Sequence, residues 1–290
     1  MVVTAYRRIQ IRNRVTPDIS RDSIDTPPEG EEVLDAQLRE GLSELHRPAD
    51  GLFLSSLSAG LDIGFGPLLM AVILTTTGLS AAGDLVTRLL LALAYGVGFI
   101  LVVIGRSELF TEHTTLAVLP VLDGRASVAR LARLWGLVYA GNVVGAALFA
   151  AVVVPVATAL GVAEPAAFVE LARTFTTHDW SVLVGAGVLA GWLMGLLSWL
   201  VAAVDSSVAR VLVVWLIAAA IGLAHLPHSV AGAVEVFAGV VAGSSVTVAD
   251  AGQFLLFTTL GNAVGGSVFV ALLKYGHVVR GGPTVESVSE

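Results

Sequence analysis

Six long apolar segments constrain the fold of this chain more than any other feature of its sequence. A bilayer core about 30 Å thick is crossed by a helix of roughly 20 apolar residues, and each segment is long enough for a crossing. The composition agrees, because only 13% of the residues are charged, against roughly a quarter in soluble domains. The segments cover residues 51–76, 87–122, 128–156, 180–204, 207–241 and 253–277. We therefore expect an all-α integral membrane protein with six transmembrane helices.

The second and fifth segments are too long for one straight crossing, and both carry polar residues at mid-length. Residues 105–112 interrupt the second segment, and Pro227 and His228 lie within the fifth. Proline removes a backbone donor and disfavours helix in the preceding residue. Irregular backbone at membrane depth is tolerated only where it is buried in protein or lines a cavity. We therefore expect two broken helices and look for a transport site at the breaks; the alternative is a kinked helix with a satisfied histidine.

An internal repeat relates the two halves of the chain. The sequence Gly141-Asn142-Val143-Val144-Gly145 in the third span matches Gly261-Asn262-Ala263-Val264-Gly265 in the sixth, 120 residues later. An odd number of spans separates the copies, so the halves have opposite topology: an inverted repeat of three plus three spans. Glu108 and His228 each lie 34 residues before the asparagine of their own half. We expect them to be counterparts near mid-membrane, and expect Gly141 and Gly261 to form close helix contacts.

The ends of the chain are polar. Residues 1–25 mix positive and negative charges and contain little to bury, which predicts a disordered cytoplasmic tail. Thr26 to Glu29 has the form of a capping box that opens a helix over 26–47. One face of that helix is apolar and carries Leu34, Leu38, Leu42 and Leu45. We expect an amphipathic cytoplasmic helix against the membrane face or the cytoplasmic span ends, or alternatively a solvated linker; residues 48–278 then form the six-span transporter domain and 279–290 a cytoplasmic tail.

The distribution of basic residues predicts the orientation. They follow the second, fourth and sixth spans, at Arg125, Arg130, Arg133, Arg210, Lys274 and Arg280. The loops near Thr77 and Gly243 hold no Lys or Arg, and the loop over 157–179 holds only Arg173. Because cytoplasmic loops are enriched in Lys and Arg, we expect a multi-pass protein of the cell membrane with both termini cytoplasmic.

Several functional classes are disfavoured by the residues present. The chain has no cysteine, so it has no disulfide, thiolate chemistry or cysteine metal site. No basic face for nucleic acid is apparent. His225 and His228 have the spacing of a helical metal pair, and Glu112-His113 could complete it, but Pro227 lies between the histidines. We expect no metal, no cofactor and no enzymatic activity.

Four short motifs, each in a different span, together carry a specific resemblance. They are Glu108-Leu109-Phe110-Thr111, Tyr139-Ala140-Gly141-Asn142, His228-Ser229-Val230-Ala231, and Leu260-Gly261-Asn262 with Gly265-Gly266. In this order the chain resembles the formate/nitrite transporter family over about residues 50–278. The resemblance implies an aquaporin-like six-span protomer, a homopentamer with one pore per protomer, and passage of small monovalent anions such as formate or nitrite across the lipid bilayer.

The resemblance also implies roles for individual residues. The family's central pore histidine falls on His228, and the threonine that hydrogen-bonds it falls on Thr111. The apolar constrictions fall near Tyr95, Phe99 and Ile221. The chain departs from the family's pattern at Arg106 before the Glu-Leu-Phe-Thr element, at Gly232 and near Gly191 where asparagines are usual, and near Phe175, where a lysine is expected and only Arg173 is close.

A bare anion cannot cross an apolar constriction cheaply, because an unpaired charge in the bilayer is costly. Histidine, whose ordinary pKa lies near neutral pH, can donate to the anion and relay a proton. We hypothesise both roles for His228, held by Thr111, in a channel or a proton-coupled transporter. Arg106 either attracts anions in the vestibule or forms an ion pair that pins the loop. Its candidate partners are Asp62, Glu108 and Glu112.

Two other functions fit the spans. One is an aquaporin-type pore for neutral solutes, although paired Asn-Pro-Ala elements are missing. The other is a sensor or scaffold in which Arg106 plugs the pore and the N-terminal helix binds a soluble partner. The identity of the anion, the coupling to protons and the direction of flux stay open at this point.

Overall fold

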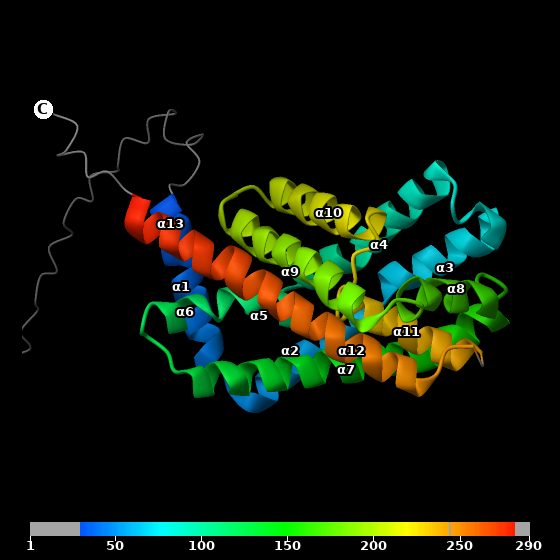
Figure 1. The fold of residues 1–290 in the computed structure, drawn as a ribbon, viewed down its shortest axis with the longest axis horizontal. Helices are drawn as coiled ribbons and strands as arrows, with labels where there is room; N and C mark the ends of the chain where they lie inside the picture. The colour runs from blue at the N-terminus through cyan, green and yellow to red at the C-terminus, as the bar shows by residue number, and fades with distance from the viewer. Residues whose placement is uncertain (1–29, 244, 282–290) are drawn as a thin grey trace, which may run out of the picture.

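The computed structural model describes residues 30–243 and 245–281, which form helices and connecting segments and contain no strand. The helices assemble into an elongated bundle (Figure 1). The predicted tail over 1–25, the capping sequence from Thr26 to Glu29 and the last nine residues of the C-terminal tail, 282–290, lie outside the described residues.

The helices run as follows along the chain. They are α1 (Gly30–His46), α2 (Ala49–Asp62), α3 (Phe65–Thr77), the 3₁₀ turn η2 (Leu79–Ala81), α4 (Leu85–Gly105), α5 (Phe110–Leu116), α6 (Leu119–Leu122), α7 (Val128–Ala159), α8 (Pro165–Thr176), α9 (Trp180–Ala202), α10 (Ser207–Leu223), α11 (Ala231–Ala242), α12 (Val248–Val264), the π-helical η3 (Gly265–Leu272) and α13 (Leu273–Gly281).

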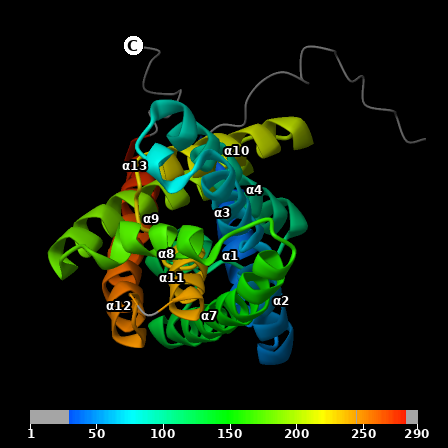
Figure 2. The same cartoon turned by 90° about the vertical axis from the view of Figure 1, so that its right-hand side faces the viewer.

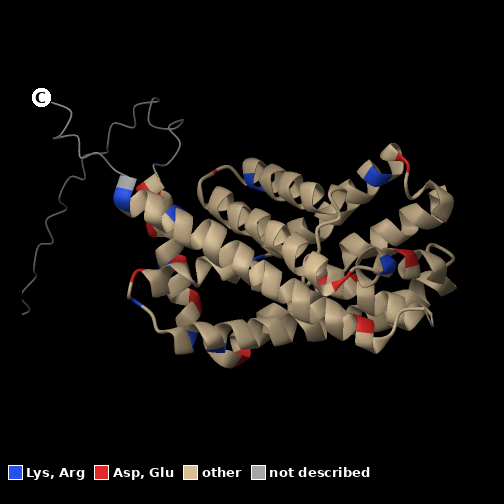
Figure 3. Ribbon diagram, viewed as in Figure 1, with Lys and Arg blue, Asp and Glu red and all other residues tan. Residues whose placement is uncertain are grey.

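Five helical stretches are long and apolar enough to cross a membrane. They are Ala49–Thr77, Leu85–Gly105, Val128–Ala159, Trp180–Ala202 and Val248–Arg280. Two shorter apolar helices, α10 and α11, occupy the fifth predicted segment. Most charged residues lie toward the two ends of the bundle (Figure 3). The expected all-helical protein with several membrane-length apolar helices is therefore confirmed.

Two helices stop where the sequence places polar residues inside an apolar segment. Helix α4 ends at Gly105 and the next helix, α5, begins at Phe110. Helix α10 ends at Leu223 and α11 begins at Ala231. Just after each ending helix lies a non-glycine residue with positive φ, Arg106 at 57° and His225 at 50°. A side chain in this left-handed region costs about 1–2 kcal/mol, so the packing around both segments must hold them in place.

Two features differ from the sequence-based expectation. The first predicted span is divided between α2 and α3 at residues 63–64, where Pro67 cannot donate a hydrogen bond in the first turn of α3. The loop predicted over 157–179 contains α8, which begins with Pro165 at its first helical position. Helix α8 buries one face that includes Phe168 and Leu171, so it is an amphipathic helix packed on the bundle.

The two halves of the chain use the same kind of close helix pair. Helix α2 packs on α7, and α9 packs on α12, while α4 and α10 join the halves. A Cβ at Gly141 would come within 2.6 Å of the Ser56 Cβ, and one at Gly261 within 2.9 Å of the Gly187 Cα. Only glycine permits this approach, as in other membrane helix pairs with small residues at the contact.

Helix α1 packs on one end of the bundle, against α5, α6, α7, α9 and α13. Its apolar face, with Leu34, Leu38 and Leu45, is buried. Gln37 Nε2 donates to the Ser198 carbonyl oxygen at 3.2 Å. The alternative of a solvated linker helix is therefore wrong. Helices α1 and α13 lie together at one end of the bundle (Figure 1), and in the end-on view α8 and α11 lie near α7 and α12 at the other (Figure 2).

Candidate functional site

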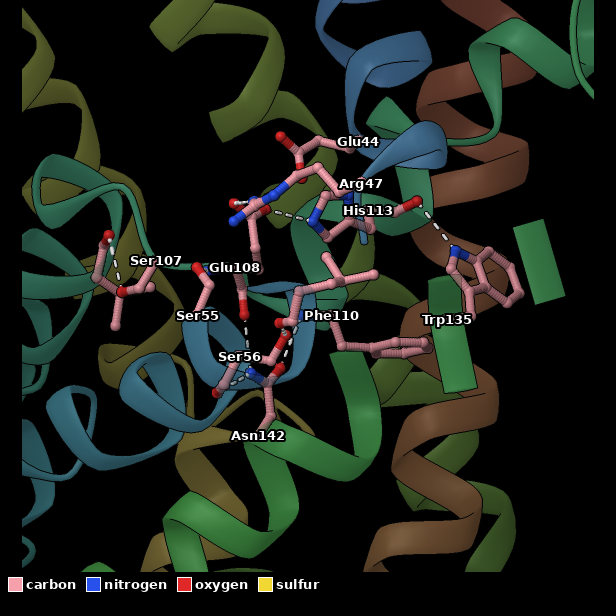
Figure 4. Close-up of polar contacts among 12 residues, drawn as sticks. Glu44, Arg47, Ser55, Ser56, Ser107, Glu108, Phe110, His113, Trp135 and Asn142 are labelled. Atoms are coloured by element: carbon pink, nitrogen blue, oxygen red, sulfur yellow. Dashed lines mark hydrogen bonds and ion pairs between the residues drawn. The ribbon is translucent and has the colours of Figure 1, made fainter. Parts of the chain in front are cut away.

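Asn142 on α7 holds the segment that joins α4 to α5 (Figure 4). The side chain is fully buried. Its Nδ2 donates to the carbonyl oxygens of Ser56 and Glu108, both at 2.8 Å, and its Oδ1 accepts from the Phe110 amide at 2.8 Å. Both donors and the acceptor of the amide group are thus used. One side chain connects α2, the interrupted segment and α5 to α7.

Asn262 on α12 makes the same three bonds in the second half. Its Nδ2 donates to the carbonyl oxygens of Gly187 at 2.8 Å and Pro227 at 3.0 Å, and its Oδ1 accepts from the Ser229 amide at 2.8 Å. Buried polar groups that are fully paired fix local geometry, because an unpaired one is costly in a low-dielectric interior. The two asparagines therefore hold the two breaks in equivalent ways.

These bonds correct the predicted equivalence of Glu108 and His228. The carbonyl bonded by Asn142 belongs to Glu108, and the one bonded by Asn262 belongs to Pro227. The amides correspond likewise, Phe110 to Ser229, so the counterpart of His228 is Leu109. The two asparagines are 120 residues apart, but the residues that they bond in the two breaks are one position closer together in sequence. The second half therefore has one more residue between its break and its asparagine than the first half.

His228 lies in the segment before α11 and is fully buried. Its Nδ1 accepts from the Val230 amide at 3.3 Å and the Ala231 amide at 3.1 Å. Backbone amides only donate, so Nδ1 carries no proton and the neutral ring carries its proton on Nε2. Nε2 lies 2.7 Å from Thr111 Oγ1 and donates to it. The Thr111 hydroxyl hydrogen is then left for another acceptor.

Aromatic rings cover one side of this pair. The Phe99 ring lies edge-on to the His228 ring, with centroids 5.0 Å apart, and the Tyr95 and Phe99 rings are 5.1 Å apart. Phe99 and Ile221 are fully buried. These are the residues predicted to form apolar constrictions. Phe99 contacts His228, Tyr95 contacts Phe99, and Ile221 lines a cavity together with Tyr95.

Two cavities lie in the described part of the molecule. One, of about 630 Å³, is lined by Tyr95, Ile221 and Glu235 among others, and we call it the Glu235 cavity. The second, of about 570 Å³, is lined by Arg106 and Glu108 among others, and we call it the Arg106 cavity. His228 and Thr111 are on neither lining, but Tyr95 of the first contacts Phe99, which contacts His228, and Glu108 of the second lies close before Thr111 in the chain.

Glu108 belongs to a charged cluster beneath α1 (Figure 4). Arg47 Nη1 lies 2.5 Å from Glu108 Oε1 and 2.7 Å from Glu44 Oε2, and His113 Nε2 lies 2.6 Å from Glu108 Oε2. Burial and then the Glu108 carboxylate raise the pKa of Glu44, which lies on α1, while Arg47 acts in the opposite direction. Carboxyl oxygens and His113 approach within 4.8 Å as metal ligands would, but Arg47 already supplies the positive charge there.

Arg106 does not form the predicted ion pair. Its side chain is exposed on the lining of the Arg106 cavity and has no ion-pair partner within the described residues. Glu108 pairs with Arg47 instead, and Asp62 accepts from Ser58 Oγ at 3.0 Å. The interpretation of Arg106 as a pinning ion pair is therefore wrong, and its charge is not cancelled by a contacting carboxylate.

Comparison with known proteins identifies the chain. The family model described as Formate/nitrite transporter matches residues 31–276. The chain belongs to the formate/nitrite transporter family. It is 31% identical over 246 residues to the inner membrane protein YfdC of Escherichia coli (strain K12), across 83% of this chain and 76% of the relative.

Solved structures of this transporter family have the same fold. An FNT family ion channel is 26% identical, with a TM-score of 0.75, across 84% of this chain and 98% of that one. A pentameric formate channel with formate bound is 26% identical, with a TM-score of 0.67, across 80% of this chain and 98% of that one. The predicted resemblance to formate/nitrite transporters is confirmed.

Proposed function

We propose that the chain assembles as a homopentamer with one pore per protomer, and that each pore passes small monovalent anions such as formate or nitrite through the cell membrane. The family and the pentameric formate channel among its structural neighbours support this proposal. In the proposed protomer α10 and α11 together make the fifth of six crossings. The halves form an aquaporin-like inverted repeat, and both termini are cytoplasmic.

The observation that carries the proposal is the buried, hydrogen-bonded pair of His228, before α11, and Thr111, on α5. An anion entering the Arg106 cavity meets the Arg106 guanidinium, which no carboxylate of the described residues contacts. Arg47, Arg210 and the carboxyl groups of Glu40, Glu44, Glu108 and Glu112 share the lining. The Thr111 hydroxyl, which accepts from His228 Nε2, offers its hydrogen to the anion. The aromatic side chains beyond it disfavour a bare charge, so the neutral acid crosses this stretch at lower cost and a proton accompanies the anion.

The proposal is tested by replacing His228 with Phe or Asn in the full chain reconstituted in proteoliposomes. Uptake of formate, nitrite, acetate, lactate and hydrosulfide is measured at two pH values. We expect the variants to lose flux or its pH dependence. The matched control is His277→Asn, because His277 is exposed on α13. An unchanged flux profile in the His228 variants contradicts the role of the histidine.

Oligomeric state and solute class need separate measurements. Native mass spectrometry of the detergent-solubilised protein gives the number of copies, and a mass other than that of five chains contradicts the pentamer. Stopped-flow swelling with water or glycerol tests for a neutral-solute pore. Swelling that depends on the protein, together with absence of flux for every anion, would replace the anion function by that of an aquaporin-type pore.

A further inference from the structure

The pore described so far leaves one buried acid without a role. Glu235 lies on α11 and is 2% exposed. Its Oε1 has no hydrogen-bond partner within the described residues, yet the residue lines the Glu235 cavity. Tyr95 on α4 is also 2% exposed, its hydroxyl also lacks a partner, and it lines the same cavity. Buried polar atoms are normally paired, so these two oxygens on one cavity are available to bind a ligand.

The other ionisable groups on this cavity set its charge. Besides Tyr95 they are Glu170 and Arg173 from α8, His178 after α8, and His225 from the connection between α10 and α11. Of the other helices packed on α11, α3 contributes only apolar side chains to the lining, and α7 and α12 contribute nothing. Glu235 forms no ion pair with any described residue. An unpaired buried carboxylate is costly, which favours the protonated acid.

A protonated Glu235 and the Tyr95 hydroxyl together present two O–H donors to the cavity. Arg173 and Glu170 add one ionisable group of each sign to the same lining. Two O–H donors suit an anion with acceptor oxygens rather than a metal ion or an amine. The site also lies next to the apolar stretch, because the Tyr95 ring contacts Phe99, which contacts His228.

We propose that Glu235 and Tyr95 form a second binding site for the anion of a small weak acid, and that Glu235 is its proton donor. The inference rests on the proposed function. The Glu235 O–H bond breaks, its proton joins an oxygen of the anion, and the bonding electron pair stays on the Glu235 carboxylate. The neutral acid then moves past Phe99. A hydronium ion from the external solution then protonates the Glu235 carboxylate and leaves as water, so one proton accompanies each anion.

The test uses formate as the probe and the full chain in proteoliposomes, with protein-free vesicles as background. Radioactive formate uptake and internal pH are followed together over a range of external pH. Glu235→Gln keeps the size of the side chain but has no carboxyl proton to give. We expect it to lower protein-dependent uptake roughly a hundredfold, the lower end of what a positioned acid contributes, and to flatten the pH profile. Tyr95→Phe should raise the half-saturating formate concentration.

Glu164→Gln is the matched control, because Glu164 is an exposed carboxyl just before α8 and is not on the cavity lining, and it should leave the profile unchanged. Wild-type formate uptake with an unaltered pH profile and proton count in Glu235→Gln overturns the inference and leaves the proposed function standing. Absence of any anion flux in the wild type instead overturns the proposed function. Should Glu235→Gln not assemble, Glu235→Asp decides: formate uptake without accompanying protons overturns the inference.

Discussion

The two asparagine contacts lead to a graded stability prediction. Asn142→Leu removes all three hydrogen bonds that the side chain makes and leaves the Ser56 and Glu108 carbonyls and the Phe110 amide unpaired. Asn142→Asp, protonated in this buried position, still accepts from the Phe110 amide and donates to one carbonyl, so it loses a single bond. The order of stability should be wild type, then Asp, then Leu.

The magnitude follows from the count of bonds. Leaving a buried donor or acceptor unpaired costs about 1–3 kcal/mol; at the low end of that range Leu costs about 3 kcal/mol and Asp about 1 kcal/mol. One kcal/mol shifts the Tm of a chain of this size by roughly 2–4 °C, which gives about 6–12 °C for Leu and about 2–4 °C for Asp. Asn262→Leu removes an equivalent set of bonds and should match Asn142→Leu.

The assay is thermal unfolding of the purified protein in detergent, followed by intrinsic tryptophan fluorescence. Tyr139→Phe is the control for a single bond, because it removes only the Thr259 Oγ1 donation to Tyr139 Oη at 2.9 Å. The reasoning is refuted if Asn142→Asp and Asn142→Leu unfold at the same temperature, or if the two Leu variants differ by more than the shift expected for one bond.

Three further predictions concern other parts of the molecule. A Cβ at Gly191 would lie 2.6 Å from the Asn262 Cα, whereas one at Gly185 meets nothing within 4 Å. Gly191→Ala should therefore lower the Tm, and Gly185→Ala should not. Equal Tm shifts in the two variants contradict the close helix contact. The folded state raises the pKa of Glu44, so the stability that this group contributes is lost as the pH rises from the usual pKa of a glutamate through the raised pKa. The Tm of Glu44→Gln should therefore rise relative to that of the wild type between acidic and neutral pH. A parallel pH dependence of the two Tm values contradicts this prediction. Arg106→Gln should leave assembly intact and reduce anion flux at low salt by roughly tenfold, the lower end of electrostatic steering; loss of the assembly would show a structural role.

The long apolar segments and their interruptions were predictable because the bilayer imposes length and backbone pairing on the sequence. Pro227 marked one break directly. The division at residues 63–64 was missed, because only Pro67 signals it and proline is common in the first turn of a helix. Helix α8 was missed because it is short and Glu170 and Arg173 interrupt its apolar residues, which therefore do not form a run.

At the candidate site the predicted pair of His228 and Thr111 is found at hydrogen-bond distance. The ion pair of Arg47 with Glu108 joins residues 61 positions apart, and it depends on where α1 packs, which no local pattern reveals. The sequence left Arg106 with two possible roles, and its candidate ion-pair partners were Asp62, Glu108 and Glu112. The left-handed backbone at Arg106 turns the chain before Glu108, and the two side chains serve different contacts.

The bonds of Asn142 and Asn262 reach main-chain atoms alone. The contacts therefore hold the segments between α4 and α5 and between α10 and α11 whatever side chains these segments carry, provided that the backbone path is kept. Leu109 and His228 occupy equivalent backbone positions in these two segments, although one side chain is a hydrocarbon and the other an imidazole. Single substitutions in these segments can therefore alter what the channel recognises while its architecture stays intact.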